Sequence, residues 1–302
     1  MRFCVSLLLT AAIAGSSACS LKQMAVNTVA STLAESGTTF TSDEDLQLVG
    51  DAIPFALKFY ESILDSTPRH QALLLATCSS FTQYAYAYVE TDAETLPRSR
   101  SAESQALRDR ALKLYLRARG YCFRAVNVRF GPGSSEALLL KPEAVVAKAK
   151  REDVPLLYWM AASWGSAISL GLDRPEVAID LPIVRVLADR ALALDEKWEK
   201  GTLHELFITL DGLPDVLGGN PARAKEHFAR AVELQKGLLP GPYVALATGV
   251  AVASQDRAEF ERLLKTALAI DPEKDPSTRL VTLVMQKRAR LLLDRIDEQF
   301  AN

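Results

Sequence analysis

The stretch GGNPARAKEHFARAVEL, residues 218–234, decides how the fold is interpreted. A glycine pair before a helix can form a loop that binds phosphate, or it can form the tight turn between two packed helices. A phosphate loop needs a strand before its glycines and a Lys-Ser or Lys-Thr pair after them. Here the preceding segment has a helical pattern, and Asn220-Pro221 follows the glycines, which suits an N-cap and a first helical position. The stretch is therefore predicted to be a corner, with Gly218 and Gly219 ending one helix at positive φ.

Most of the remaining chain has the hydrophobic spacing of helices, with few β-branched runs and few alternating segments. Two local signals support the helix boundaries. Thr67-Pro68 is expected to begin a helix as Asn220-Pro221 does, and Thr202-x-x-Glu205 has the spacing of a capping box. The expected helices are at 44–65, 69–90, 100–129, 155–171, 176–195, 202–217, 221–236, 241–254, 256–270 and 276–299.

An alanine between long apolar residues recurs at the end of every second expected helix. It lies in RALALD (190–195), RAVELQ (230–235) and TALAID (266–271), and RALKLY (110–115) lies two periods earlier. Small side chains let neighbouring helices approach, and tetratricopeptide-like repeats use this to bury one another's faces. The period exceeds the roughly 34 residues of the standard repeat. The predicted fold class is all-α, with irregular tetratricopeptide-like helical hairpins stacked as a compact solenoid.

The N-terminus has the pattern of a secretory signal peptide. MRFCVSLLLTAAIAGSSACS contains one basic residue, an apolar run and then small residues that end at Cys19. The apolar run is shorter than the roughly 20 residues that a membrane-spanning helix needs. The site resembles the lipobox of bacterial lipoproteins, whose cysteine carries a diacylglycerol, although Ser16 stands where that motif usually has leucine. Cleavage near Ala18 without a lipid is the alternative.

The expected organisation has three parts. Residues 1–18 are the signal peptide, residues 19–42 are a lipid anchor and a flexible Ser- and Thr-rich tether, and residues 43–302 are one all-α domain. The formal net charge of -2 and the pI of about 6.0 argue against a nucleic-acid partner, which usually binds a basic patch. Cys78 and Cys122 both lie in apolar helical patterns, so two buried thiols are the simpler expectation. A disulfide between them is the alternative, because pairing cannot be deduced from sequence.

Candidate catalytic residues are few. His204 and His227 have adjacent glutamates, Glu205 and Glu226, but neither stretch has the spacing of metal ligands. Glu205 is also assigned to the capping box. The chain contains no Gly-x-Ser-x-Gly elbow and no signal for a Cys-His pair. The sequence therefore predicts no enzyme, no cofactor and no metal site.

The segment VPLLYWMAASWGSAISLGL, residues 154–172, contains no charged residue. A membrane span is disfavoured because Pro155 lies near the start of the segment and no basic flank sets an orientation. A helix that is apolar on all sides is normally buried, so the central helix of the solenoid is the simpler interpretation. The alternative is a ligand channel, because aromatic rings with polar tips also line pockets. Its predicted lining consists of Tyr84, Tyr158, Trp159 and Trp164.

Several stretches together resemble one family of lipoproteins, the T-component of tripartite ATP-independent periplasmic (TRAP) transporters. They are AIPFALKFYESIL, YAYAYVE, PLLYWMAASWGSAI, GTLHELFI, GGNPARAKEHFARAVEL, GPYVALATGVAV and DRAEFERLLKTALAIDP, and the resemblance extends from about Asp51 to Phe300. It implies a periplasmic lipoprotein of cryptic tetratricopeptide-like helices that associates with a TRAP-type solute-binding protein. It also implies homo-oligomers, trimers among them, and a pore or cleft for a small and often hydrophobic ligand.

Two functional hypotheses follow. The preferred one is a binding adaptor of a solute-uptake system, held by a lipid at Cys19 in the outer rather than the inner membrane. The preference for the outer membrane rests on Ser20 after the cysteine, by analogy with enteric bacteria. The alternative is a scaffold lipoprotein that assembles envelope complexes and binds no small ligand.

Overall fold

Every regular element of the structure is helical. The computed structural model describes residues 27–32, 38–171 and 179–300, and no strand occurs within them. The predicted all-α fold is confirmed, whereas the stacking of hairpins as a tetratricopeptide-like solenoid remains a prediction. Cys19 and the whole expected signal peptide lie outside the described residues.

The helices agree with the expected ranges in most of the chain, with short additional helices at 91–95, 134–140 and 142–146. Two π-helical stretches, η1 (Ala85–Glu90) and η6 (Ala247–Ala251), continue α4 and α14. The α-helices are α2 (Thr38–Thr41), α3 (Leu46–Ser66), α4 (Gln71–Tyr84), α5 (Thr91–Thr95), α6 (Ser101–Phe130), α7 (Ser134–Leu140), α8 (Pro142–Val146), α9 (Val154–Ser169), α11 (Leu181–Leu194), α12 (Thr202–Asp211), α13 (Pro221–Leu234), α14 (Gly241–Leu246), α15 (Arg257–Leu268) and α16 (Arg279–Asp294).

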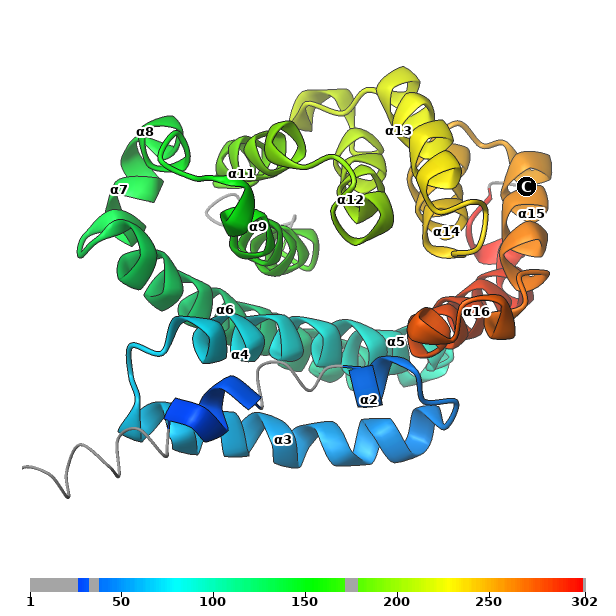
Figure 1. Ribbon diagram of the computed structural model, residues 1–302. Coiled ribbons are helices and arrows are strands. Elements are labelled where there is room, and N and C mark those ends of the chain that lie inside the picture. Colours follow the sequence, from blue (N-terminus) through cyan, green and yellow to red (C-terminus); the bar gives the residue numbers. More distant parts are fainter. Residues whose placement is uncertain (1–26, 33–37, 172–178, 301–302) are drawn as a thin grey trace, which may run out of the picture.

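The helices follow a closed circuit (Figure 1). α3, α4 and α6 lie along one side, α7 and α8 turn the chain, and α11 to α14 form the opposite side, with α9 between α6 and α11. α15 and α16 then bring the chain back to α2, α3 and α5, so the helical array closes on itself. At this seam, Arg288 Nη2 donates to Glu94 Oε1 at 2.6 Å, and the Tyr86 hydroxyl donates to Met285 Sδ at 3.5 Å.

The alanines of the recurring motif lie in the hydrophobic core. Ala111, Ala191, Ala231 and Ala267 are each 0% exposed, as their predicted role at helix contacts requires. One core cluster extends from α3 to α12, and a second extends from α12 to α16. The motif thus marks helix faces that are buried against their neighbours.

The corner at residues 218–221 is confirmed in part. Asn220 caps α13 by accepting from the Ala222 and Arg223 amides, and Gly218 has a φ of +82°. α12 ends at Asp211, however, and a short 3₁₀ turn, η5 (Asp215–Leu217), separates it from the glycines. Gly219 does not have positive φ. It is required because a Cβ there would lie 1.6 Å from the Leu213 carbonyl oxygen.

Two predicted capping signals are wrong, although α12 begins at Thr202 as expected. Thr67 is the C-cap of α3, where its hydroxyl donates to the Ile63 carbonyl, and α4 begins after His70, whose Nδ1 accepts from the Leu73 amide. Gly201 precedes α12 with a φ of +80°, and no side-chain cap is formed there. Glu205 is therefore not a capping residue and is available for another role.

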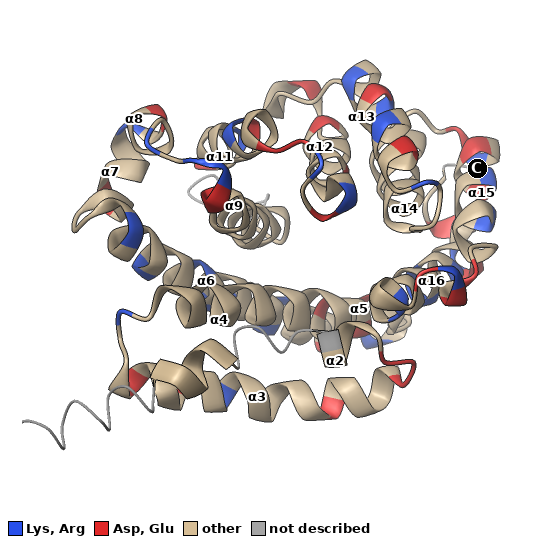
Figure 2. Ribbon diagram, viewed as in Figure 1, with Lys and Arg blue, Asp and Glu red and all other residues tan. Residues whose placement is uncertain are grey.

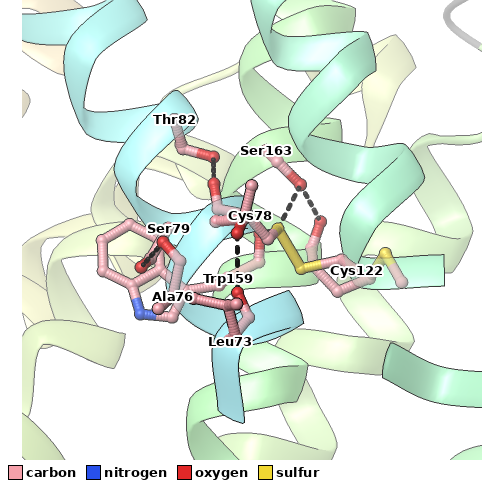
Figure 3. The surroundings of a disulfide bond; sticks show 10 residues. Leu73, Ala76, Cys78, Ser79, Thr82, Cys122, Trp159 and Ser163 are labelled. Atoms are coloured by element: carbon pink, nitrogen blue, oxygen red, sulfur yellow. Dashed lines mark hydrogen bonds between the residues drawn. A yellow bond between two sulfur atoms is a disulfide. The ribbon is translucent and has the colours of Figure 1, made fainter. Parts of the chain in front are cut away.

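Cys78 and Cys122 form a disulfide, so the expectation of two thiols is wrong (Figure 3). The bond joins α4 to α6, with a Cα–Cα distance of 5.5 Å, and both residues are 0% exposed. Burial in an apolar pattern is common to thiols and half-cystines, so the pattern could not separate them. The relative register of α4 and α6, which brings the two residues together, is not encoded locally.

Part of the expected tether contacts the helical body. Ala30 is 0% exposed, and Ser31 Oγ lies 3.2 Å from His70 Nε2. The Arg279 guanidinium donates to the Ser42 carbonyl at 2.9 Å, which holds the end of this segment against α16. The domain boundary at residue 43 remains a prediction.

Candidate functional site

Two of the four predicted channel residues lie in the packed body. Trp164 is 1% exposed, with its ring edge-on to Phe123 and beneath the Arg119 guanidinium. Tyr84 is 9% exposed and stacks on Tyr88, whose ring packs against Gly50 of α3. In this arrangement Trp164 offers no surface to a ligand, and Tyr84 lies on the side of α4 that faces α3.

The other two predicted residues, Tyr158 and Trp159, are partly exposed. Their rings meet edge-on at 5.0 Å, and Tyr158 also packs against Trp198 at 4.9 Å. The Tyr158 hydroxyl lies 3.5 Å from Thr202 Oγ1. Burial raises the pKa of Tyr158 to about 12, so the hydroxyl is neutral and can both donate and accept a hydrogen bond.

Tyr86 faces away from Tyr84 and Tyr88, which lie on the opposite face of the same helical stretch. It is partly exposed, its hydroxyl contacts Met285 of α16, and Arg288 lies over its ring at 4.9 Å. Burial raises the pKa of Tyr86, and the charges of Arg288, Glu90, Glu94 and Glu205 also act on it. Tyr86 is therefore the tyrosine of the YAYAYVE segment that contacts α16.

Glu205, in the first turn of α12, is the unusual titratable group of this region. It keeps accessible surface, yet burial raises its pKa to about 7, and the nearby Gln235 amide only partly opposes this. Its charge acts on both Tyr86 and Tyr158. The three residues come from η1, α9 and α12, three segments that lie far apart in the sequence. We call Tyr86, Tyr158, Glu205 and Gln235 the inner cluster.

Gln235 is the second unusual residue of the inner cluster. It directly follows α13 and is 3% exposed, but neither atom of its side-chain amide has a hydrogen-bond partner within the described residues. The amide lies near the Glu205 carboxyl without reaching hydrogen-bonding geometry. Buried amides are normally paired, because an unpaired one loses its hydrogen bonds to water without replacement.

Acidic groups outnumber basic ones around Tyr86. Glu90 is buried, and burial raises its pKa, although Arg288 and a 2.5 Å hydrogen bond from the Tyr115 hydroxyl oppose the rise. Arg288 is the basic partner, paired with Glu94. Burial lowers the pKa of Arg288, but Tyr86, Glu94 and Glu90 outweigh this and raise it. Two carboxyl groups, those of Glu90 and Glu94, thus act on the Arg288 guanidinium, and the charge of Glu205 acts on Tyr86 beside it.

The two predicted histidines form a separate polar cluster between α12 and α13. His204 Nδ1 lies 2.8 Å from His227 Nδ1, and His204 Nε2 lies 3.2 Å from Glu196. Asp211, which is 1% exposed, accepts from Arg185 and Arg223 at 2.8 Å each. The sequence analysis did not predict that the histidines meet, because 23 residues separate them.

The described part of the chain contains no group of three or more His, Cys, Asp or Glu residues placed to hold a metal ion. Within those same residues, no helix is both long enough and apolar enough to cross a bilayer. One open surface groove lies between the start of α3 and α16, where Asp45, Glu273 and Arg279 contribute to its wall. This groove is separate from the inner cluster.

Comparison with known proteins defines the class. The model of the family "TRAP transporter T-component" matches residues 42–300, so the chain belongs to this family. The chain is also 28% identical over 301 residues to an uncharacterized protein of Treponema pallidum (strain Nichols), and the match covers 93% of each chain. The match confirms the family that the sequence resembles. Members of this family are transport-associated components.

Proposed function

We propose that this chain is a non-enzymatic periplasmic lipoprotein that assists a TRAP-type solute-binding protein in the uptake of a small ligand. The family match over residues 42–300 carries the proposal. The inner cluster supports a ligand-binding role, because Tyr86, Tyr158 and Glu205 keep accessible surface although burial raises the pKa of each. Aromatic walls with a few polar groups are typical of sites for small molecules.

The ligand site that we propose differs in part from the predicted channel. Tyr158 and Trp159 stay in it, Tyr86 and Glu205 join it, and Trp164 supports it from the core. The ligand would contact side chains of η1, α9, α12 and α16, from which Tyr86, Tyr158, Glu205 and Arg288 act on one another. A Trp164→Phe change should then reduce stability modestly and leave ligand affinity unchanged.

The experiment that tests this function uses the mature protein and the solute-binding protein encoded nearest to it. Native mass spectrometry of the purified lipoprotein reports the oligomeric state, for which a homo-oligomer is expected, and any ligand retained inside it. Co-purification with the solute-binding protein, with and without that ligand, reports the association. Absence of both a retained ligand and an association would contradict the uptake role.

The anchor is tested separately. Cys19→Ala should move the protein from the detergent phase to the soluble fraction, or leave it as an unprocessed precursor, because the diacylglycerol has no other attachment site. Incorporation of radiolabelled palmitate checks this. Labelling that persists in the variant would contradict lipidation at Cys19.

A scaffold without a small ligand is the second candidate function, and one surface feature favours it. Leu48, Phe55 and Phe59 of α3 are 59%, 75% and 42% exposed, and the two phenylalanine rings stack at 6.1 Å. Figure 2 shows few charged residues on this helix. The spacing places the three side chains on one helix face, which is typical of a protein contact. Phe55→Ser should then abolish co-purification with an envelope partner while the helical content stays unchanged.

A further inference from the structure

The inner cluster holds a carboxyl group without a basic partner. Glu205 forms no ion pair in the part of the chain that the structure describes, and its carboxyl group is buried with the Gln235 amide as the polar group that acts on it. A carboxylate in such surroundings is poorly stabilised, as its raised pKa shows. An ion pair with a bound cation would supply the missing partner.

The backbone near Glu205 is built to hold this carboxyl group in place. A Cβ on Gly241 would lie 2.2 Å from Glu205 Oε1, so the carboxyl packs directly on a glycine that leaves room for it. The Gln235 amide acts on the same carboxyl group and offers a carbonyl oxygen and an NH₂ group that form no hydrogen bond with the described residues. The cluster therefore presents two acceptors, the carboxylate and the amide oxygen, next to each other.

Aromatic faces complete the surroundings. Tyr158 packs on Trp159 and Trp198, and Tyr86 approaches from η1. Cations are attracted to the faces of Trp and Tyr rings, more strongly where water is excluded. Arg288 already occupies one such position over Tyr86, which shows that this ring accommodates a cation.

We propose that the inner cluster binds a small organic ammonium ion, a protonated amine with an apolar body. Its N–H groups donate to the Glu205 carboxylate and to the Gln235 carbonyl oxygen, and its apolar part packs on Tyr158 and Tyr86. Glu90 and Glu94 oppose Arg288 nearby and add to the preference for a positive charge. The proposal rests on the proposed function, in which the interior of the circuit holds a small ligand, and it specifies the chemical class of that ligand.

Binding of an ammonium ion should depend on pH through Glu205. Glu205 acts on the neutral tyrosines Tyr86 and Tyr158, and the Gln235 amide acts on Glu205. Of the neighbouring elements, η4 (Trp198–Gly201) contributes Glu199, which acts on Tyr158, whereas α14 and η6, at 241–251, contain no charged residue. His227, Arg185 and Arg223 of the neighbouring helices contact His204 and Asp211 instead. Since Glu205 has a pKa of about 7, its ionised fraction changes about tenfold between pH 6 and pH 8.

The test uses three probes of one shape and different charge, which are cyclohexylmethylamine, cyclohexylmethanol and cyclohexanecarboxylate. Isothermal titration calorimetry of the mature protein at pH 8 should give a dissociation constant for the amine at least tenfold below those of the other two. At pH 6 the amine should bind about tenfold more weakly, because it stays protonated while Glu205 becomes neutral. The affinity for the alcohol should not change with pH.

Two variants complete the test. Glu205→Gln keeps the size of the side chain and should weaken binding of the amine by tenfold or more, while binding of the alcohol stays the same. Glu226→Gln makes the same charge change at an exposed site on α13 and should leave all three affinities unchanged.

Three results would overturn the ammonium proposal. They are an amine that binds no more tightly than the alcohol, an amine affinity that Glu205→Gln leaves unchanged, and no binding of any probe. Binding of the alcohol or the carboxylate in preference to the amine would still support an interior ligand site with a different ligand class. The retained ligand seen by native mass spectrometry decides the proposed function independently of these probes.

Discussion

At the scale of single residues, the contact between His204 and His227 is sensitive to protonation. A distance of 2.8 Å between two Nδ1 atoms requires one ring to donate and the other to accept, so both rings cannot be charged. Burial lowers the pKa of each histidine, and the Glu196 hydrogen bond opposes this only at His204. The pair is therefore most stable when neutral.

The lowered pKa of both histidines predicts that the protein loses stability in acid. An unfolded histidine binds a proton as the pH falls through about 6.5, whereas the folded pair does so only at lower pH, so the free energy of unfolding should fall from pH 7.5 to 5.5. His227→Gln should make this dependence shallower in chemical denaturation measured at several pH values. A dependence as steep in the variant as in the parent would show that the pair does not titrate as argued.

The titration of Glu205 changes the stability with pH in the opposite direction, so its contribution must be measured separately from that of the histidines. Its pKa is raised to about 7, so the folded state binds a proton that the unfolded state releases above about 4.3, and lowering the pH through 7 stabilises the fold. The effect of His227→Gln is therefore measured in a protein that already carries Glu205→Gln, so that Glu205 does not titrate. Restoring Glu205 should reduce the loss of stability between pH 7.5 and 5.5.

At the scale of elements, the corner before α13 depends on two glycines for different reasons. Gly218 has positive φ, whereas Gly219 is needed because the Leu213 carbonyl lies where a Cβ would be. Gly218→Ala should reduce the free energy of unfolding by about 1 kcal/mol. Gly219→Ala should reduce it by about 2 kcal/mol or more, because the backbone must move.

Thermal denaturation of the two glycine variants checks this order, with Gly120→Ala as a control. No atom lies within 4 Å of the position that a Cβ on Gly120 would take, and this residue lies inside α6. Alanine is favoured over glycine inside a helix, so the control should be as stable as the parent or more so. A larger loss at Gly218 than at Gly219 would contradict the argument.

The pairing of α4 with α6 predicts a large effect of reduction. The disulfide between Cys78 and Cys122 closes a loop with a sequence separation of 44 residues. The chain-entropy model gives about 4 kcal/mol of stabilisation for a loop of this length. Cys78→Ala with Cys122→Ala should lower the free energy of unfolding by about this amount, and dithiothreitol should destabilise the parent but not the variant. A parent that dithiothreitol leaves unchanged after unfolding would indicate free thiols.

The same elements show what the sequence could and could not reveal. Asn220-Pro221 predicted its helix start correctly, because both the cap and the fixed φ of proline act within three residues. Thr202 and Glu205 have the spacing of a cap, but Thr202 lies by Tyr158 and Glu205 lies by Gln235. These contacts with distant residues outweigh the local preference for a capping box. The sequence analysis did not predict the inner cluster for that reason. The disulfide likewise depends on how two distant helices are aligned.

At the scale of the whole molecule, the closed circuit depends on the seam between α16 and α5. Arg288 and Glu94 are 16% and 19% exposed and lie in a partly buried network with Tyr86 and Glu90. Lys287 forms a second ion pair with Asp92 at 3.4 Å, but both of these side chains are largely exposed, at 45% and 57%. The two adjacent pairs connect the same helices and differ chiefly in burial, which makes them a matched comparison.

Arg288→Met should open this seam, because it removes the ion pair with Glu94 while it keeps much of the side-chain volume. Removing one partner of a buried pair reduces stability by about 3 kcal/mol. Lys287→Met should reduce it by less than about 1 kcal/mol, since exposed ion pairs contribute little. Hydrogen exchange should show faster exchange in α5 and α16 of the Arg288 variant, with α9 and α12 unchanged. Equal losses in the two variants, or faster exchange spread evenly over all helices, would mean that the circuit is held by its hydrophobic core rather than by this seam.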